Sequence, residues 1–171
     1  MNVDVVIAGG GPVGTTLGIA LGRRGVSHIV VERQAEIYPL PRAIVMDAEV
    51  RSALLALGVS SSLADHLTTM TRADFVQPDG TEIMGIDTAG LILFGVPAVS
   101  CHYQPELEEF LHGEARAAGS VRIDGVEVID HRQDADGVDV QLSDGTTVRT
   151  KYLVACDGAS SAIRKREGIA L

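Results

Sequence analysis

A glycine-rich turn follows a largely apolar segment at the start of the chain. Val3–Ala8 leads directly into Gly9, Gly11 and Gly14. In a strand–turn–helix unit the first glycine permits the tight turn, the second lets the backbone approach a pyrophosphate, and the third lets the helix pack closely on the strand. The helix start then offers free N–H groups and the positive end of its dipole to phosphates. The spacing predicts a dinucleotide-binding βαβ unit.

An acidic residue ends the second strand of this unit. The segment Ile29–Glu32 is apolar up to its last residue. A carboxylate at this place accepts hydrogen bonds from a ribose 2′-OH and repels a 2′-phosphate. The tightly held nucleotide is therefore expected to be FAD or NAD and not NADP. The helix between the strands should end at Gly25 and bury one apolar face, formed by Val13, Leu17, Ala20 and Leu21.

Composition limits the classes of protein and partner. The chain has 171 residues, enough for one domain with a core, and 46% of them are hydrophobic, which excludes a disordered or fibrous protein. The net charge of -9 argues against nucleic acid and anionic membranes as partners. Cys101 and Cys156 lack CxxC spacing and are expected to be buried thiols in a reducing cytoplasm. No signal peptide, membrane span or metal site is expected.

Turn residues and periodicity divide the rest of the chain into short elements. Helices are expected from an Asp47 cap to Leu57, over Ser61–His66, from Pro105 to Ala118 and over Ser160–Glu167; a hairpin is expected over Ala73–Ile86, and Gln34–Ala43 is a loop. The segment Leu91–Ser100 is either a loop over a pocket or buried packing. After a segment at Val121–Ile123, three strands form a predicted antiparallel β-meander, Val126–His131, Val138–Leu142 and Thr146–Val148, followed by a separate, fully buried strand at Tyr152–Ala155. The fold class is α/β, with a Rossmann-like, mainly parallel sheet.

Three segments together resemble one flavoprotein family. They are the stretch from Gly9 to Arg33, the triplet Pro41–Ala43, and the run from Tyr152 through Asp157 and Gly158 to Arg164. As a set they are similar to the FAD-dependent aromatic hydroxylases of the p-hydroxybenzoate hydroxylase type. The amino-acid sequences of the segments Tyr38–Glu49 and His102–Glu108 are most similar to the branch resembling 3-(3-hydroxyphenyl)propionate hydroxylase. The resemblance implies a glutathione-reductase-type FAD-binding domain over residues 1–171, the N-terminal portion of a longer architecture.

The resemblance also implies roles for individual residues. Gly9, Gly11 and Gly14, with Pro12 and Val13 between them, would cradle the FAD pyrophosphate, and Glu32 would hold the adenosine ribose. Arg33 would lie along the adenine, Arg42 would reach the pyrophosphate, Gln104 would hydrogen-bond a phosphate, and the Val128 backbone would touch the adenine. Asp157 and Gly158 would hold the ribityl side of the flavin. Arg42 could instead be a solvated loop arginine, Gln104 a helix-start residue, and Asp157 a turn former.

The implied reaction is hydroxylation of a phenolic substrate. NADH or NADPH, between which nothing in the sequence decides, would reduce FAD, and O2 captured as a flavin C4a-hydroperoxide would supply the oxygen. The family continues beyond the Asp-Gly segment into a substrate sheet and a second, Gly-Asp FAD motif, which the 171 residues lack. Alternatives are therefore a truncated FAD-binding module that needs a missing half, with exposed apolar surface promoting self-association or binding of a second chain, an NAD-binding dehydrogenase domain, and an interaction module without ligand.

Overall fold

The computed structural model describes residues 2–170 and divides them into two compact units. The first combines the chain up to Tyr38 with the chain from Glu108 onward, and the second is Pro39–Leu107.

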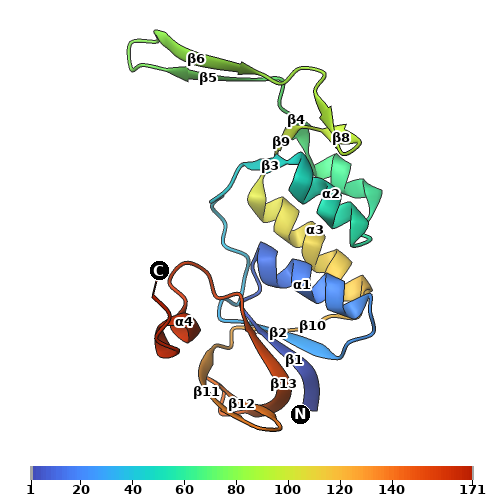
Figure 1. Ribbon diagram of the computed structural model, residues 1–171, viewed down its shortest axis with the longest axis vertical. Coiled ribbons are helices and arrows are strands. Elements are labelled where there is room, and N and C mark those ends of the chain that lie inside the picture. Colours follow the sequence, from blue (N-terminus) through green and yellow to red (C-terminus); the bar gives the residue numbers. More distant parts are fainter. Residues whose placement is uncertain (1, 171) are drawn as a thin grey trace. The chain divides into compact units, whose positions relative to one another are not determined.

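The first unit is built on a six-stranded sheet in the order β10-β2-β1-β13-β12-β11 (Figure 1). Strands β10, β2, β1 and β13 run parallel, whereas β13, β12 and β11 are joined antiparallel. Their bounds are β1 Asn2–Ala8, β2 His28–Glu32, β10 Val121–Asp124, β11 Val128–Asp134, β12 Gly137–Leu142 and β13 Thr147–Ala155. This arrangement confirms the predicted α/β class with a mainly parallel sheet and a three-stranded meander.

The central strands are apolar on both sides because both faces of the sheet are covered. On one face Val6 and Val31 belong to a buried cluster with side chains of β12 and β13. On the other face Ile7 and Val30 are buried, and Leu17 of helix α1 packs against them. The continuous apolar runs that predicted these strands therefore reflect two-sided burial, not alternation between core and water.

Helix α1, Pro12–Gly22, begins as the glycine pattern predicts, and Leu17 and Leu21 of the predicted apolar face pack against the sheet, but Val13 does not. The prediction that Val13 belongs to the packed face is wrong, because its side chain is 71% exposed. The buried positions instead carry small residues that let the helix approach closely. They are Gly14, Thr15 and Gly18, together with Ile19.

Strand β13 corrects a second prediction. The segments Thr146–Val148 and Tyr152–Ala155 are not separate strands, since Thr147–Ala155 is continuous and Lys151 lies within it. Its first half pairs with β12 and nearly its whole length pairs with β1, so one strand serves both the meander and the parallel sheet. It is also not fully buried, because Tyr152 is 66% exposed.

The second unit contains short elements around helix α2, Ala48–Ala56. The Asp47 side chain accepts a hydrogen bond from the Val50 N–H and caps α2 as predicted. The 3-10 helix η1, Ser61–His66, also lies where the sequence places it. A small sheet has the order β3-β9-β4, formed by Val45–Asp47, Val99–Cys101 and Thr68–Thr69.

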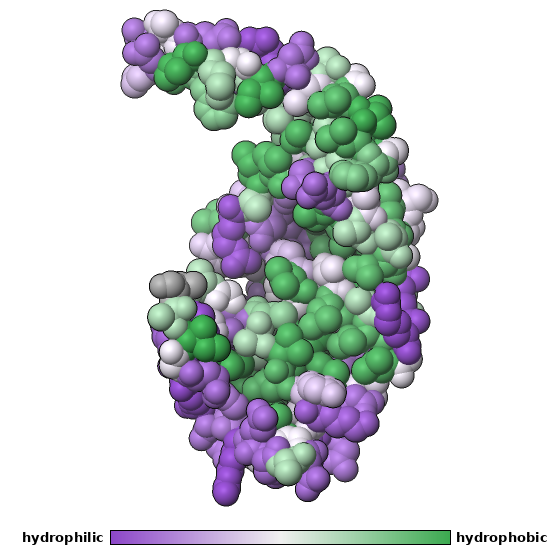
Figure 2. All heavy atoms as spheres, in the orientation of Figure 1, coloured by the Kyte–Doolittle hydropathy of each residue, from purple (hydrophilic) through white to green (hydrophobic). Residues whose placement is uncertain are grey.

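Two hairpins extend from this second unit. Strands β5, Arg72–Val76, and β6, Glu82–Asp87, confirm the predicted hairpin, and Figure 2 shows hydrophobic side chains on its surface. Strands β7, Ile92–Leu93, and β8, Val96–Pro97, form the second, with Phe94 exposed at its turn. The sequence predicts either a loop over a pocket or buried packing for Leu91–Ser100. The structure shows that this segment contains the hairpin of β7 and β8.

Two further helices complete the fold. Helix α3, Gln104–Ala117, agrees with the predicted helix and buries Leu107, Leu111 and Ala115. Helix α4, Ala162–Arg166, is shorter than the predicted segment Ser160–Glu167. No helix among residues 2–170 is long and apolar enough to cross a membrane.

Candidate functional site

The glycine turn lies at the carboxyl end of β1, where the strand order changes direction. Helix α1 leads from β1 to β2 on one side, and β13 flanks β1 on the other. Gly9 has a φ of +102°, and a Cβ there would lie 2.3 Å from the Cys156 carbonyl oxygen at the end of β13. Only glycine tolerates both this backbone conformation and this short distance. The turn and the segment that leads into Asp157 are therefore in direct contact. Ligands of open α/β sheets bind at such a switch point.

Gly14 and Gly11 serve different purposes. A Cβ on Gly14 would lie 1.9 Å from the Gly9 carbonyl oxygen, so this glycine permits close packing of α1 on the turn. A Cβ on Gly11 would meet nothing within 4 Å, which leaves open space directly before the helix. No side chain caps the first turn of α1, and Pro12 occupies its first position. The N–H groups of this turn and the open space at Gly11 suit an anionic group such as a pyrophosphate.

The carboxylate of Glu32 is held by backbone N–H groups on both oxygens. Oε2 accepts from the Gly10 N–H at 2.6 Å, and Oε1 accepts from the Gln34 N–H at 2.9 Å. The side chain is half-buried at the end of β2. Because each carboxylate oxygen can accept more than one hydrogen bond, the arrangement leaves acceptor capacity for ribose hydroxyls. A negative charge at the end of this strand would also repel a 2′-phosphate.

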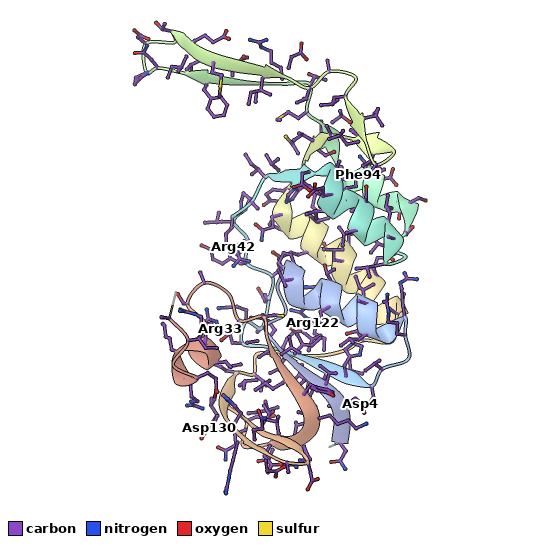
Figure 3. All side chains as sticks on the ribbon, in the orientation of Figure 1. Asp4, Arg33, Arg42, Phe94, Arg122 and Asp130 are labelled. Atoms are coloured by element: carbon purple, nitrogen blue, oxygen red, sulfur yellow. The ribbon has the colours of Figure 1, made fainter. Side chains whose placement is uncertain are left out.

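Residues predicted to contact adenine surround the end of β2. Arg33 follows Glu32 directly and is exposed (Figure 3). The Val126 N–H donates to the Glu32 carbonyl oxygen at 3.0 Å, so the chain entering β11 crosses this edge. Val128, the first residue of β11, is half-buried and packs against the core. The structure thus places Arg33 and Val126 at the strand end that carries Glu32, and Val128 follows two residues after Val126.

Arg42 and Gln104 lie together in the second unit. The Gln104 side-chain oxygen accepts from the Arg42 N–H at 2.8 Å and from the Ala43 N–H at 2.7 Å. These bonds fix the backbone that carries the exposed Arg42 side chain. They give Gln104 a structural contact of its own, in addition to the predicted contact with a phosphate, which stays a prediction for both residues.

The Asp157 carboxylate accepts hydrogen bonds at the start of helix α4. Its Oδ2 accepts from the Ala162 N–H at 2.8 Å and from the Ile163 N–H at 3.3 Å. Burial raises the pKa of Asp157, but hydrogen bonds from Ser161, Ile163 and Ala162 outweigh it, so the pKa lies below its usual 3.8. Gly158 has a φ of +82° and turns the chain from β13 toward α4. The ionised Asp157 thus organises this segment beside the glycine turn.

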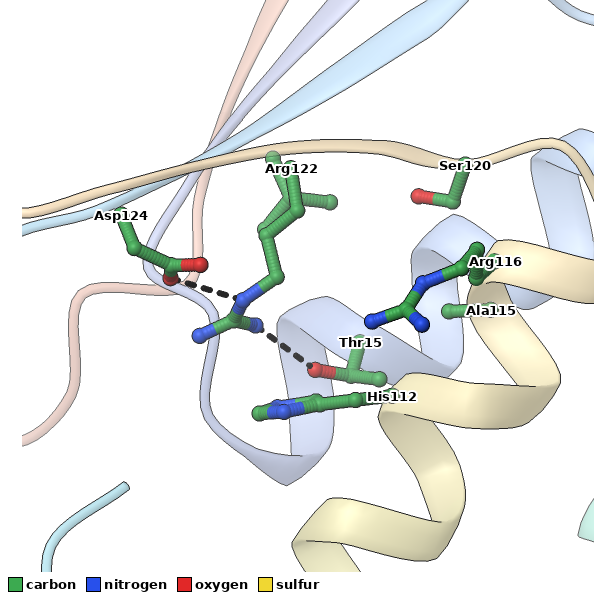
Figure 4. Close-up of a pocket in the computed structure, with 8 residues that line it drawn as sticks. Thr15, His112, Ala115, Arg116, Ser120, Arg122 and Asp124 are labelled. Atoms are coloured by element: carbon green, nitrogen blue, oxygen red, sulfur yellow. Dashed lines mark hydrogen bonds and ion pairs between the residues drawn. The ribbon is translucent and has the colours of Figure 1, made fainter. Parts of the chain in front are cut away.

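The sequence did not predict a cluster of polar side chains that lies beside the glycine turn. Arg122 and Asp124 of β10, Thr15 of α1 and His112 of α3 line a cavity of about 250 Å³, which Val30, Ala115, Arg116 and Ser120 complete (Figure 4). Burial and the positive charge of Arg122 lower the pKa of His112 below 6.5. The one available signal was the alternation in Val121–Asp124, which places Arg122 and Asp124 on the same face of a predicted strand.

The two cysteines are less buried than the sequence predicts. Cys101 and Cys156 are free thiols, as expected, but both are half-buried. Burial and the charge of Asp157 raise the pKa of Cys156 above 9.0. Its position at the end of β13 makes it a neighbour of the glycine turn.

Comparison with known proteins agrees with this geometry. The family model described as FAD binding domain matches residues 2–171. The chain is 36% identical to 3-(3-hydroxy-phenyl)propionate/3-hydroxycinnamic acid hydroxylase of Mycobacterium sp. (strain JLS), over 98% of this chain and 30% of the relative. It is 34% identical to the probable NADH-specific resorcinol 4-hydroxylase of Rhodococcus jostii (strain RHA1), over 97% of this chain and 32% of the relative.

A solved structure gives the same result. The flavin-dependent monooxygenase PieE, crystallised with FAD and substrate, superimposes with a TM-score of 0.87 at 30% identity, covering 100% of this chain and 33% of PieE. The chain therefore spans about a third of the length of the proteins that it matches. An open glycine turn, an uncapped helix start and a carboxylate with remaining acceptor capacity fit FAD, and the family match agrees. The chain belongs to the FAD-binding domain family of the flavoprotein aromatic hydroxylases.

Proposed function

We propose that the chain holds the adenosine and pyrophosphate half of FAD in a flavoprotein monooxygenase that hydroxylates a phenolic or other aromatic substrate with NADH or NADPH and O2. The observation that carries this proposal is that the open space at Gly11 and the Glu32 carboxylate occur together, since Glu32 accepts a hydrogen bond from the neighbouring Gly10 N–H. The hydroxylation belongs to an enzyme of the relatives' full length, of which residues 1–171 form the FAD-binding domain.

The glycine turn binds the pyrophosphate through its backbone. The N–H groups of Gly11, Val13 and Gly14 lie at the start of α1, where the helix dipole favours a negative group. Pro12 has no N–H to leave unsatisfied and fixes the backbone of the first turn. Arg42 adds a guanidinium, which suits phosphate geometry, and Gln104 fixes the loop that carries it and contacts a phosphate.

The remaining residues orient the cofactor along the sheet edge. Glu32 accepts hydrogen bonds from the adenosine ribose, Arg33 lies along the adenine, and the Val128 backbone borders it. Asp157 and Gly158 direct the chain past the ribityl side of the flavin. Bound FAD supplies the redox chemistry, taking electrons from the nicotinamide donor and activating oxygen. The protein positions it and excludes water.

The partners follow from this role. We propose a small aromatic substrate and a cytoplasmic location, without a nucleic-acid or membrane partner. The exposed apolar side chains of the second unit, such as Phe75, Ile83 and Phe94, support self-association or cover by a second chain. A relative named as NADH-specific supports NADH as one of the two donors to test.

The first experiment is the ultraviolet-visible spectrum of the purified chain, as isolated and after addition of FAD and gel filtration. Flavin bands that co-elute with the protein support the proposed binding role and call for assays of NADH and NADPH oxidation with phenolic substrates. A protein that stays colourless, and that also fails to quench FAD fluorescence in solution, contradicts FAD binding by these 171 residues alone. The NAD-binding alternative would instead give a calorimetric signal with NAD and none with FAD.

A further inference from the structure

The middle glycine of the turn has no role in the dinucleotide pattern. Gly10 occupies a position that the pattern leaves free, and its φ is not in the left-handed region. A Cβ there would lie 2.5 Å from Nη1 of Arg122. Glycine at this place therefore makes room for the Arg122 guanidinium, which comes from a strand more than a hundred residues further along the chain.

Arg122 forms hydrogen bonds on two sides. Its Nη1 donates to the Gly10 carbonyl oxygen at 2.8 Å. Its Nε donates to Asp124 Oδ1 at 2.8 Å (Figure 4). Two features hold the guanidinium in place. It forms an ion pair with Asp124, and only 24% of the Arg122 side chain is exposed. The bond to Gly10 is charge-assisted and therefore stronger than one between neutral groups.

The Gly10 carbonyl oxygen has two further neighbours. The Thr15 hydroxyl donates to it at 2.9 Å, and His112 Nε2 lies 3.4 Å away. On the other side of the same residue, the Gly10 N–H donates to Glu32. Both polar groups of the Gly10 backbone are thus held. Its N–H contacts the residue proposed to bind ribose, and its carbonyl oxygen contacts polar side chains from β10, α1 and α3.

We propose that Arg122 is a positioning residue, which fixes Gly10 so that the glycine turn and the Glu32 carboxylate are preformed for the dinucleotide. Preformed groups bind more tightly because less conformational entropy is lost on binding. The part of this inference that concerns affinity rests on the proposed function. The ordering of the turn does not, because it is a property of the protein without ligand.

The test compares Arg122→Gln and Arg122→Lys with Arg116→Gln as the matched control, because Arg116 lines the same cavity without contacting Gly10. In the ligand-free chain, amide hydrogen exchange at the non-proline residues of 9–14 should accelerate in Arg122→Gln, while exchange in the core strand β12 stays unchanged. Lysine keeps a charged donor and should restore part of the protection. Exchange at residues 9–14 equal to that of the control overturns the inference, whether or not the protein binds FAD.

Affinity provides the second measurement. FAD titration should show binding about tenfold weaker in Arg122→Gln, the scale of one charge-assisted hydrogen bond. Gly10→Ala displaces the same guanidinium, so the double variant should lose little more than the weaker-binding single variant. Additive losses, or unchanged affinity of Arg122→Gln beside a parent that binds, contradict the inference. A parent that fails to bind FAD contradicts the proposed function instead, and the exchange result still decides the role of Arg122.

Discussion

The Glu32 carboxylate and the Gly10 peptide N–H meet at 2.6 Å, which joins the end of β2 to the glycine turn after β1. The two parts of the predicted nucleotide site are therefore in direct contact, and the residue proposed to hold the ribose also orders the turn proposed to hold the pyrophosphate. A change at Glu32 should be felt at both.

Replacing Glu32 by Ala should weaken FAD binding by about 1.5 to 3 kcal/mol, the scale of a charge-assisted hydrogen bond. Isothermal titration of the chain with FAD measures the effect. Glu36→Ala, an exposed acid in the following loop, is the matched control and should bind like the parent. Equal affinity of the Glu32 variant and this control would remove Glu32 from the site.

Replacing Gly14 by Ala should lower the free energy of unfolding by about 1 to 3 kcal/mol, as expected for overpacking. The added Cβ would lie 1.9 Å from the backbone carbonyl oxygen of Gly9, where no flexible side chain can move aside. Gly113→Ala in α3 is the control, because its Cβ would meet nothing within 4 Å. Urea unfolding should show the control unchanged or stabilised by up to about 1 kcal/mol. Equal stabilities of both variants would refute the packing role of Gly14.

Replacing Asp157 by Ala should fray the start of α4, with a local loss of about 0.5 to 2 kcal/mol, because the Ala162 and Ile163 N–H groups lose their acceptor. Amide exchange at these two positions gives the measurement. Asp157→Asn keeps an acceptor oxygen and should keep the protection. If asparagine frays α4 as much as alanine does, the charge and not the cap stabilises this segment.

The stability of the first unit should fall in mild acid because of His112. Burial and Arg122 lower the pKa of His112 in the folded chain, so the unfolded chain binds the proton more readily. The contribution of the neutral side chain is complete above about pH 6.5 and decreases as the pH falls below that value. Urea unfolding at pH 7.5 and 5.5 should show a smaller loss in His112→Gln than in the parent. An identical loss in both proteins would exclude His112 as the source.

Local sequence was sufficient for much of this protein. The glycine spacing and the acid at Glu32 predicted the βαβ unit, and turn residues placed the hairpin β5–β6 and the cap at Asp47. These features depend on neighbouring residues, whose backbone preferences and short-range hydrogen bonds a pattern can express. The resemblance then named the FAD-binding family.

Tertiary structure decided the rest. Helix α1 buries Gly14 and Gly18 and leaves Val13 in solvent, because close approach to the turn and to β2 requires small residues there. Strand β13 stays continuous through Lys151 because pairing with β1 supports it beyond the meander. Arg122 reaches Gly10 only because β10 lies beside β2 in the strand order, and no local pattern records which distant strands become neighbours.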